Sequence, residues 1–98
     1  MIEHIVLFKL KDTATDEQVE AMLAALAGLR SAVPGIVDLS VGKNFSERGQ
    51  GFGIGLVVRF ENREALDAYI PHPAHRGCVD QFVKPIAADL IVADYEIG

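Results

Sequence analysis

The residues best suited to chemistry in this sequence lie in one short segment, from Tyr69 to Cys78. It holds two of the 3 histidines, one of the 2 tyrosines and the only cysteine. An imidazole titrates near neutrality and is the commonest general acid or base, and a tyrosine hydroxyl can donate a hydrogen bond to a carbonyl or enolate oxygen. This composition predicts acid–base catalysis, with His75 as the base and Tyr69 as the donor.

Each of these side chains also has a purely structural interpretation. His72 lies between two prolines and is typical of a turn residue that caps a backbone group. Cys78 is typical of a small buried hydrophobic residue, and Tyr69 of a half-buried ring with its hydroxyl at the surface. The third histidine, His4, lies on an apolar strand face, where a core imidazole hydrogen-bonded to the backbone is the commoner case. The residues alone leave both interpretations open.

Metal and phosphate chemistry find weaker support. His72 and His75 are three residues apart and Asp80 follows, but no second cluster stands at ligand spacing, so we expect no metal. The glycines between positions 49 and 55 lead into a strand, whereas a phosphate-binding loop leads out of one. We therefore predict no cofactor.

Composition limits the class of protein. The chain has 98 residues, 50% of them hydrophobic, with 9 basic and 14 acidic residues and a formal net charge of −5. This length fits one domain over 1–98, and the acidic balance disfavours nucleic acid as a partner. No run reaches the ~18 apolar residues of a membrane span, no secretory signal stands at the N-terminus, and a single cysteine forms no internal disulfide. We expect a cytoplasmic protein with no membrane partner.

Periodicity indicates the elements that must position these residues. A capping-box spacing of Thr15 and Gln18 precedes an apolar stripe that predicts a helix over 16–32, which Pro34 and Gly35 end. Alternating apolar residues predict strands, and shorter apolar stripes predict helical pieces. The predicted strands are 2–10, 36–45, 52–60 and 88–95, the helical pieces are 63–69 and 74–84, and a polar loop covers 46–51.

The order strand, helix, strand, strand, broken helix, strand predicts an α+β fold, the ferredoxin-like β-α-β-β-α-β sandwich with an antiparallel four-stranded sheet. Two helices cover only one face of such a sheet, and a contiguous exposed apolar patch is uncommon on a soluble monomer. The apolar residues assigned to the other face are Ile5, Leu7, Val37, Leu39, Val41 and Val57. We therefore expect a homodimer whose two sheets face each other and enclose a barrel-like interior.

The sequence resembles the stress-responsive dimeric α/β-barrel (Dabb) domain family. The resemblance rests on the opening strand from His4 to Lys11, the junction from Val33 to Ile36, the His-Pro-x-His run after Tyr69 and the closing Asp94-Tyr95. It covers almost the whole chain and implies a ferredoxin-like subunit that closes a β-barrel as a homodimer. Most members of the family have no assigned activity.

One plant member of the family is a polyketide cyclase, in which a His–Tyr pair promotes an intramolecular aldol condensation between the sheet and the helices. The resemblance implies that His75 is the general base, that Tyr69 positions the substrate carbonyl, and that His4 is a polar residue of the pocket. His72 is assigned to substrate binding as well. The implied apolar lining consists of Val6, Phe8, Met22, Leu23, Leu26 and Leu56. Leu26 and Cys78 stand where that enzyme has aromatic residues, so the polyketide substrate does not carry over.

Several functions remain open. The first is a small-molecule-binding or catalytic homodimer, which as an enzyme would be a cofactor-independent lyase, cyclase or isomerase. The alternative is a non-enzymatic, stress-associated structural dimer with architectural histidines, and a thiol function of Cys78 is a third. We also expect the loop 46–51 to gate the pocket. Some relatives hold a cation on backbone carbonyls, which here would be those of Val33 and Ile36.

Overall fold

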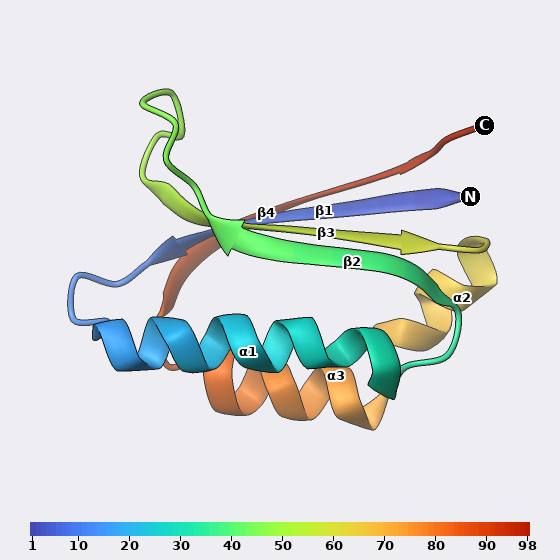
Figure 1. Cartoon of the computed structure of the whole chain (residues 1–98), viewed down its shortest axis with the longest axis horizontal. Helices are drawn as coiled ribbons and strands as arrows, with labels where there is room; N and C mark the ends of the chain where they lie inside the picture. Colours follow the sequence, from blue (N-terminus) through green and yellow to red (C-terminus); the bar gives the residue numbers. More distant parts are fainter.

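A computed structural model describes all residues from 1 to 98 and has the predicted element order. The elements are β1 (Ile2–Leu10), α1 (Asp16–Ala32), β2 (Ile36–Lys43), β3 (Phe52–Phe60), α2 (Arg63–Tyr69), α3 (Pro73–Cys78), the π-helical turn η1 (Val79–Val83) and β4 (Ala87–Glu96). The strands form one antiparallel sheet in the order β2-β3-β1-β4. All the helices lie on the same face of this sheet (Figure 1). The ferredoxin-like α+β fold is thus confirmed.

Helix α1 begins and ends where the sequence predicts. The hydroxyl of Thr15 accepts the Gln18 N–H at 3.1 Å, and the Gln18 side chain accepts the Thr15 N–H at 3.0 Å, which completes the capping box. Past its end, Gly35 adopts a φ of +88°, and a Cβ there would lie 2.7 Å from the Cβ of Ala65. Only glycine fits this turn, which brings β2 back along the sheet.

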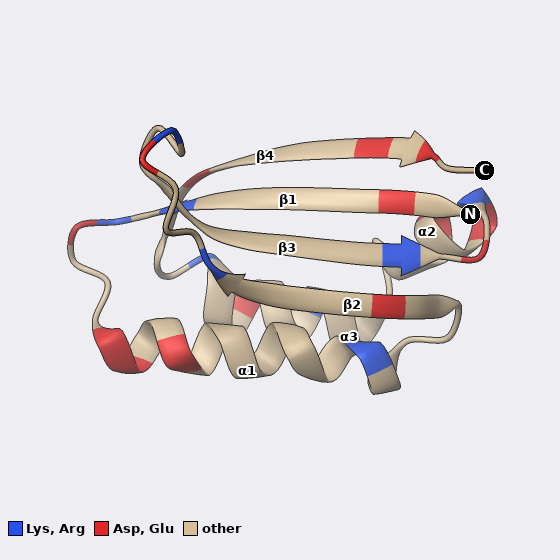
Figure 2. Cartoon of the chain, turned by 45° about the horizontal axis from the view of Figure 1, so that its top comes forward, with Lys and Arg blue, Asp and Glu red and all other residues tan.

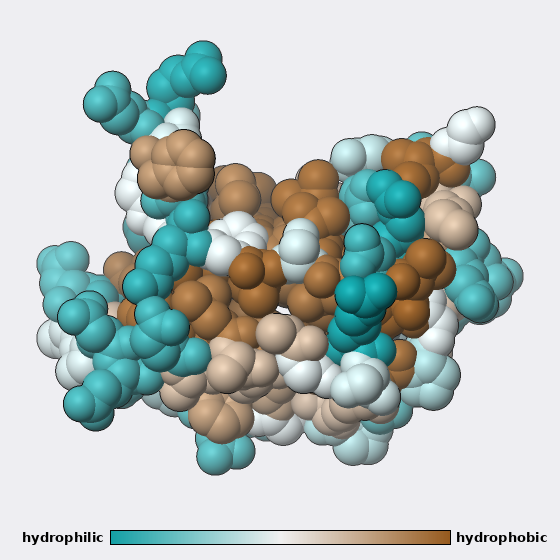
Figure 3. All heavy atoms as spheres, in the orientation of Figure 1, coloured by the Kyte–Doolittle hydropathy of each residue, from teal (hydrophilic) through white to brown (hydrophobic).

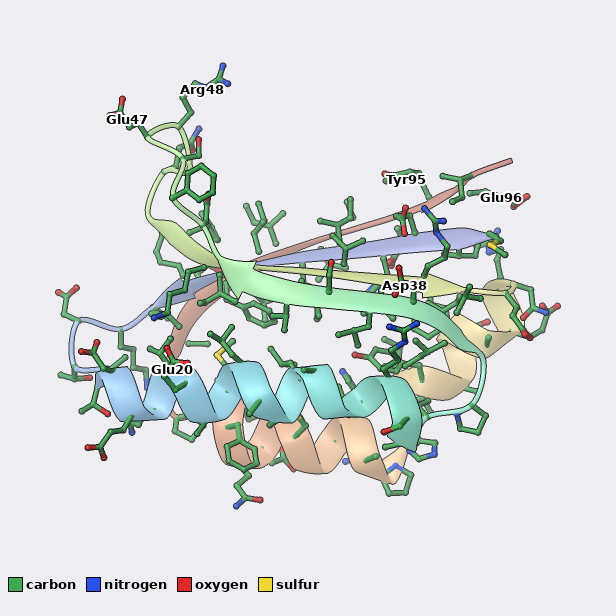
Figure 4. The ribbon with its side chains drawn as sticks, viewed as in Figure 1. Glu20, Asp38, Glu47, Arg48, Tyr95 and Glu96 are labelled. Atoms are coloured by element: carbon green, nitrogen blue, oxygen red, sulfur yellow. The ribbon has the colours of Figure 1, made fainter.

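Strand β2 is shorter than predicted, because Asn44 leaves the strand to close the following loop. Its amide donates to the Phe52 carbonyl at 2.8 Å, and its side-chain oxygen accepts the Ser46 N–H at 2.9 Å. The loop then rises on the side of the sheet away from the helices (Figure 1). Figure 4 shows Glu47 and Arg48 at the tip of this loop, far from the helical layer.

The assignment of Leu39 and Val41 to the open face of the sheet is wrong. An irregularity between Ile36 and Asp38 shifts the register of β2, so that Leu39 pairs with Val58 and Val41 with Leu56 on the covered side. Both side chains pack against the core. The apolar side chains of the open face are those of Ile5, Leu7, Val57, Ile91, Ala93 and Tyr95.

The second helical segment runs without a break from Pro73 to Val83, close to the helix predicted over 74–84, but its last turn is π-helical. Helix α3 begins one residue earlier with Pro73, whose missing N–H is not needed in a first turn. It passes into η1, where the Lys84 N–H donates to the Val79 carbonyl at 2.8 Å, a span of five residues. None of the helices is long and apolar enough to cross a membrane.

Candidate functional site

An apolar cavity of about 210 Å³ lies between the sheet and the helices, on the β4 side of the covered face. Its floor comes from β1, β3 and β4, and its other walls come from α1, the α2–α3 junction, α3 and η1. The lining residues are His4, Val6, Phe8, Leu26, Leu56, Tyr69, Ile70, His75, Val79, Val83, Leu90 and Val92. The two histidines and the tyrosine are its polar groups, which is the usual make-up of a small-molecule site.

The structure brings most of the predicted site residues together. Seven of them line this one cavity: His4, Val6, Phe8, Leu26, Leu56, Tyr69 and His75. The remaining three do not line it. Met22 lies one turn before Leu26 in α1 and is fully buried within the core, and Leu23 packs against the core from the neighbouring helical position. His72 is the N-cap of α3, where its Nδ1 accepts the Ala74 N–H at 3.1 Å.

Five lining residues were missed by the sequence analysis: Ile70, Val79, Val83, Leu90 and Val92. The strand order of the predicted fold could have identified two of them. In a ferredoxin-like sheet the last strand pairs with the first, and here Val92 lies opposite Val6 and Leu90 opposite Phe8. The other three lie at the break between α2 and α3 or in η1, where no simple helical period holds.

The loop 46–51 does not gate this cavity. It contributes no lining residue, and it rises from the opposite face of the sheet (Figure 1). The preceding Phe45 is fully exposed. The polar, glycine-containing sequence predicts a loop correctly but does not say toward which face that loop bends.

The hydrogen bond of His75 determines which ring nitrogen carries the proton. Its Nδ1 lies 2.9 Å from the carbonyl of Ile70, and since a carbonyl only accepts, Nδ1 carries the proton and Nε2 keeps a lone pair. Burial is the main cause that lowers the pKa of His75 below 6.5, and the nearby His4 and His72 lower it further. The hydrogen bond to Ile70 opposes this shift. At neutral pH the imidazole is therefore uncharged and able to take a proton.

Tyr69 is buried beside His75. The residue is only 1% exposed, and the centroid of its ring lies 4.2 Å from that of the His75 ring. The hydroxyl forms no hydrogen bond within the protein, yet no buried side-chain oxygen or nitrogen lacks a partner, so this hydroxyl must reach the space of the cavity. Burial raises the pKa of Tyr69 well above 10, which keeps the phenol protonated.

His4 stands at the other side of Tyr69, with 5.8 Å between the ring centroids. Its Nδ1 is hydrogen-bonded to the carboxylate of Asp94, the residue directly opposite on β4. Its partner is thus a side chain, and not the backbone group that the structural interpretation assumed. The ring of Tyr69 thus contacts the rings of both His4 and His75.

Cys78 is buried against the same core, and burial raises the pKa of its thiol. A thiol rather than a thiolate is the form present at neutral pH, which disfavours nucleophilic chemistry. No group of three or more histidine, cysteine, aspartate or glutamate side chains is placed to hold a metal ion.

Sequence comparison adds a family and relatives to this geometry. The model of the stress responsive A/B barrel domain family matches residues 2–97. Olivetolic acid cyclase of Cannabis sativa is 29% identical over 96 residues, an alignment that covers 96% of this chain and 94% of that protein.

Solved structures share the fold. A crystal structure of an Arabidopsis thaliana protein is 27% identical with a TM-score of 0.89, covering 100% of this chain and 96% of that one. A Thermobifida fusca protein of unknown function, described as dimeric and ferredoxin-like, is 28% identical with a TM-score of 0.87. That match covers 98% of this chain and 90% of the other.

Proposed function

Since this chain belongs to the stress responsive A/B barrel domain family, we propose that its cavity binds a small apolar molecule with a carbonyl group. The observation that carries the proposal is the pairing of His75 and Tyr69 at one wall, a base with a free lone pair beside a phenol with no partner. A cavity of ~150 Å³ is enough for benzene, so about 210 Å³ fits a molecule with one ring.

The arrangement supports removal of a proton next to the carbonyl. The Tyr69 hydroxyl donates a hydrogen bond to the carbonyl oxygen, and Nε2 of His75 takes the proton from the neighbouring carbon. The C–H electron pair then forms the enolate, whose charge falls on the oxygen that Tyr69 holds. Reprotonation of the enolate at another carbon completes an isomerisation, whereas attack of the enolate carbon on a second carbonyl completes a cyclisation. The name of the similar Cannabis protein, a cyclase, supports the second outcome.

The experiment is exchange of the methyl protons of acetophenone in D2O, followed by proton NMR. We expect the protein to accelerate the exchange and His75→Ala to abolish the acceleration, because a general base contributes ~10²–10⁴-fold. Tyr69→Phe is expected to lower the rate by ~10²-fold, the effect of removing one oxyanion donor.

The matched control is His72→Asn. It removes an imidazole three residues away that does not line the cavity, and asparagine keeps an N-cap acceptor for α3. This variant should exchange at the wild-type rate. Exchange by the wild type no faster than in buffer, or equal exchange by wild type and His75→Ala, would contradict the proposal.

We further infer that two copies associate through their open sheet faces. The apolar side chains there are only partly covered by their own chain, and Figure 3 shows an apolar surface hollowed between the loop before β3 and the end of β4. The similar Thermobifida protein is described as dimeric. A second copy is the occupant that fits, since an isologous contact buries the same patch twice.

A structural dimer without catalysis is the second candidate. It is supported by His72 and His4, because each uses one ring nitrogen for a hydrogen bond within the protein. It predicts that His75→Ala lowers the melting temperature and that neither variant nor wild type affects acetophenone.

A further inference from the structure

We propose that His4 and Asp94 form a second acid–base group of the cavity, in which Asp94 is the positioning residue that turns Nε2 of His4 toward the ligand. This inference rests on the proposed function and adds to it a proton donor on the sheet side of the cavity, whereas His75 lies on the helical side. It is carried by strand register, by hydrogen bonding and by the two cavities on either side of the pair.

The register of β1 and β4 creates the pair. His4 and Asp94 are direct cross-strand partners, 90 residues apart in sequence, and both side chains point to the helical side of the sheet. The carboxylate contacts Nδ1 of His4. Because a carboxylate accepts, it holds the proton on Nδ1 and leaves a lone pair on Nε2.

Nε2 of His4 opens into the apolar cavity. The residue as a whole is only 4% exposed, and Nε2 has no hydrogen-bond partner in the protein. No buried side-chain nitrogen is left without a partner, so this atom is not sealed in the core, and His4 lines the cavity. The ring of Tyr69 lies next to it, with that of His75 beyond at 4.2 Å from Tyr69.

Asp94 faces a different environment from the histidine that it holds. Its side chain is 43% exposed, and it lines a polar cavity of about 300 Å³ between the end of β4 and α2. Arg63 and Glu96 line the same cavity. The carboxylate therefore stays in contact with water, whereas the imidazole faces apolar side chains. The pair links the two cavities through one hydrogen bond.

This arrangement supplies a proton that His75 alone cannot. In an aldol closure His75 takes the carbon-bound proton, the enolate carbon bonds to a second carbonyl carbon, and that carbonyl oxygen becomes an alkoxide. A proton that Nε2 of His4 has first taken up from water is then given to the alkoxide, breaking N–H and forming O–H. The ring returns to the neutral form that Asp94 still holds. The cycle is complete when His75 has released its proton to water and His4 has taken one up from water. The substrate class is thus a compound with two carbonyl groups.

The first test measures the His4 tautomer by long-range proton–nitrogen correlation NMR on 15N-labelled protein, above pH ~7.5, where free imidazole is neutral. We expect His4 to carry its proton on Nδ1 in the wild type and to shift toward the Nε2-protonated form in Asp94→Ala. Glu96→Ala is the matched control, because Glu96 lies on the same strand face and lines the same polar cavity without touching His4. An Nε2-protonated wild type, or a tautomer unchanged in Asp94→Ala, would overturn the proposal.

The second test measures cyclisation of 2,6-heptanedione, a molecule with two carbonyl groups, beside acetophenone exchange. We expect Asp94→Ala to slow cyclisation about 10- to 100-fold, the effect of losing an outer-shell carboxylate behind a histidine, while acetophenone exchange falls much less. Asp94→Asn keeps the side-chain volume if the alanine variant fails to fold. Equal loss of both reactions in a folded Asp94 variant would overturn the proposal and leave the proposed function standing. A tautomer shift in a protein that exchanges no acetophenone would overturn the proposed function alone and support the positioning role of Asp94.

Discussion

The two faces of the sheet bury their apolar residues by different means. On the covered face, Val58 and Phe60 are completely buried by the helices of their own chain. Their neighbours Val57 and Arg59, which point the other way, remain partly exposed. The helical layer also ends before the sheet does. Figure 2 shows β4 as the strand farthest from α1, and Leu90 and Val92 on it are 46% and 45% exposed. The cavity forms where the helices stop covering the sheet.

The charged residues are distributed unevenly along the strands. Figure 2 shows the charged residues toward the ends of the strands, with an uncharged stretch between them. At one end, Arg59 binds Glu3 at 2.9 Å, and this contact is the main cause that raises the pKa of Arg59. One face is thus covered within the chain, whereas the other leaves its apolar residues partly exposed, and the proposed second copy would cover them.

The largest effect is expected in the core of the covered face. Phe60→Ala should cost about 4 kcal/mol of unfolding free energy, because it removes a fully buried ring and leaves a cavity. Thermal unfolding measures it, and for a domain of this size each kcal/mol corresponds to about 4–8 °C. Phe45→Ala is the matched control, since that ring is 100% exposed and should change stability by less than about 0.5 kcal/mol. Equal losses of unfolding free energy in the two variants would contradict the distinction between a buried and an exposed position.

On the open face the expected effect is on assembly. Leu7→Arg places a charge in the middle of the apolar patch, and in an isologous contact the change counts twice. We expect the dissociation constant of the dimer to rise at least ~100-fold, which corresponds to about 3 kcal/mol of association free energy. Sedimentation at micromolar concentration measures this change. Ala27→Arg adds the same charge at an exposed position of α1 and should leave the assembly unchanged. A wild type that sediments as a monomer would refute the role assigned to this face.

The sequence predicted the features whose signal lies within a few neighbouring residues, and it missed those that depend on residues far apart in the chain. The capping box of Thr15 and Gln18 is local, and α1 followed from it. The His-Pro-x-His run is also local, and it led to His75. By contrast, the partner of His4 lies 90 residues away, and only strand register identifies Asp94.

The errors have equally physical causes. The irregularity before Asp38 moved Leu39 and Val41 to the other face, and alternation in the sequence carries no sign of such a shift. The π-helical turn left Val79 and Val83 outside the predicted lining. Leu23 was placed in the cavity by the family resemblance, but its side chain packs against the core and does not line the cavity.

A smaller effect is expected in the core at the end of α3. Cys78→Ala should cost about 1 kcal/mol, because it removes one small buried group from the covered side. Since burial raises the pKa of this thiol, alkylation of native protein by iodoacetamide should be slower than that of the unfolded chain. Mass spectrometry of the alkylated protein measures both rates. Native alkylation at the unfolded rate would mean that the covered layer opens easily.

The smallest effect concerns the pH dependence of stability at His75. Burial beside the cavity lowers its folded pKa below 6.5, so on acidification the unfolded chain takes up this proton first. The stabilising contribution is therefore complete above pH ~6.5, declines as the pH falls toward the folded pKa, and is constant below it. The difference in unfolding free energy between wild type and His75→Gln, measured by urea titration from pH 8 to 5, should narrow on acidification. A difference that widens would mean that the folded protein binds this proton more tightly. His75 would then be a charged group with no lone pair for the carbon-bound proton, and the covered face would lose its chemical distinction from the open one.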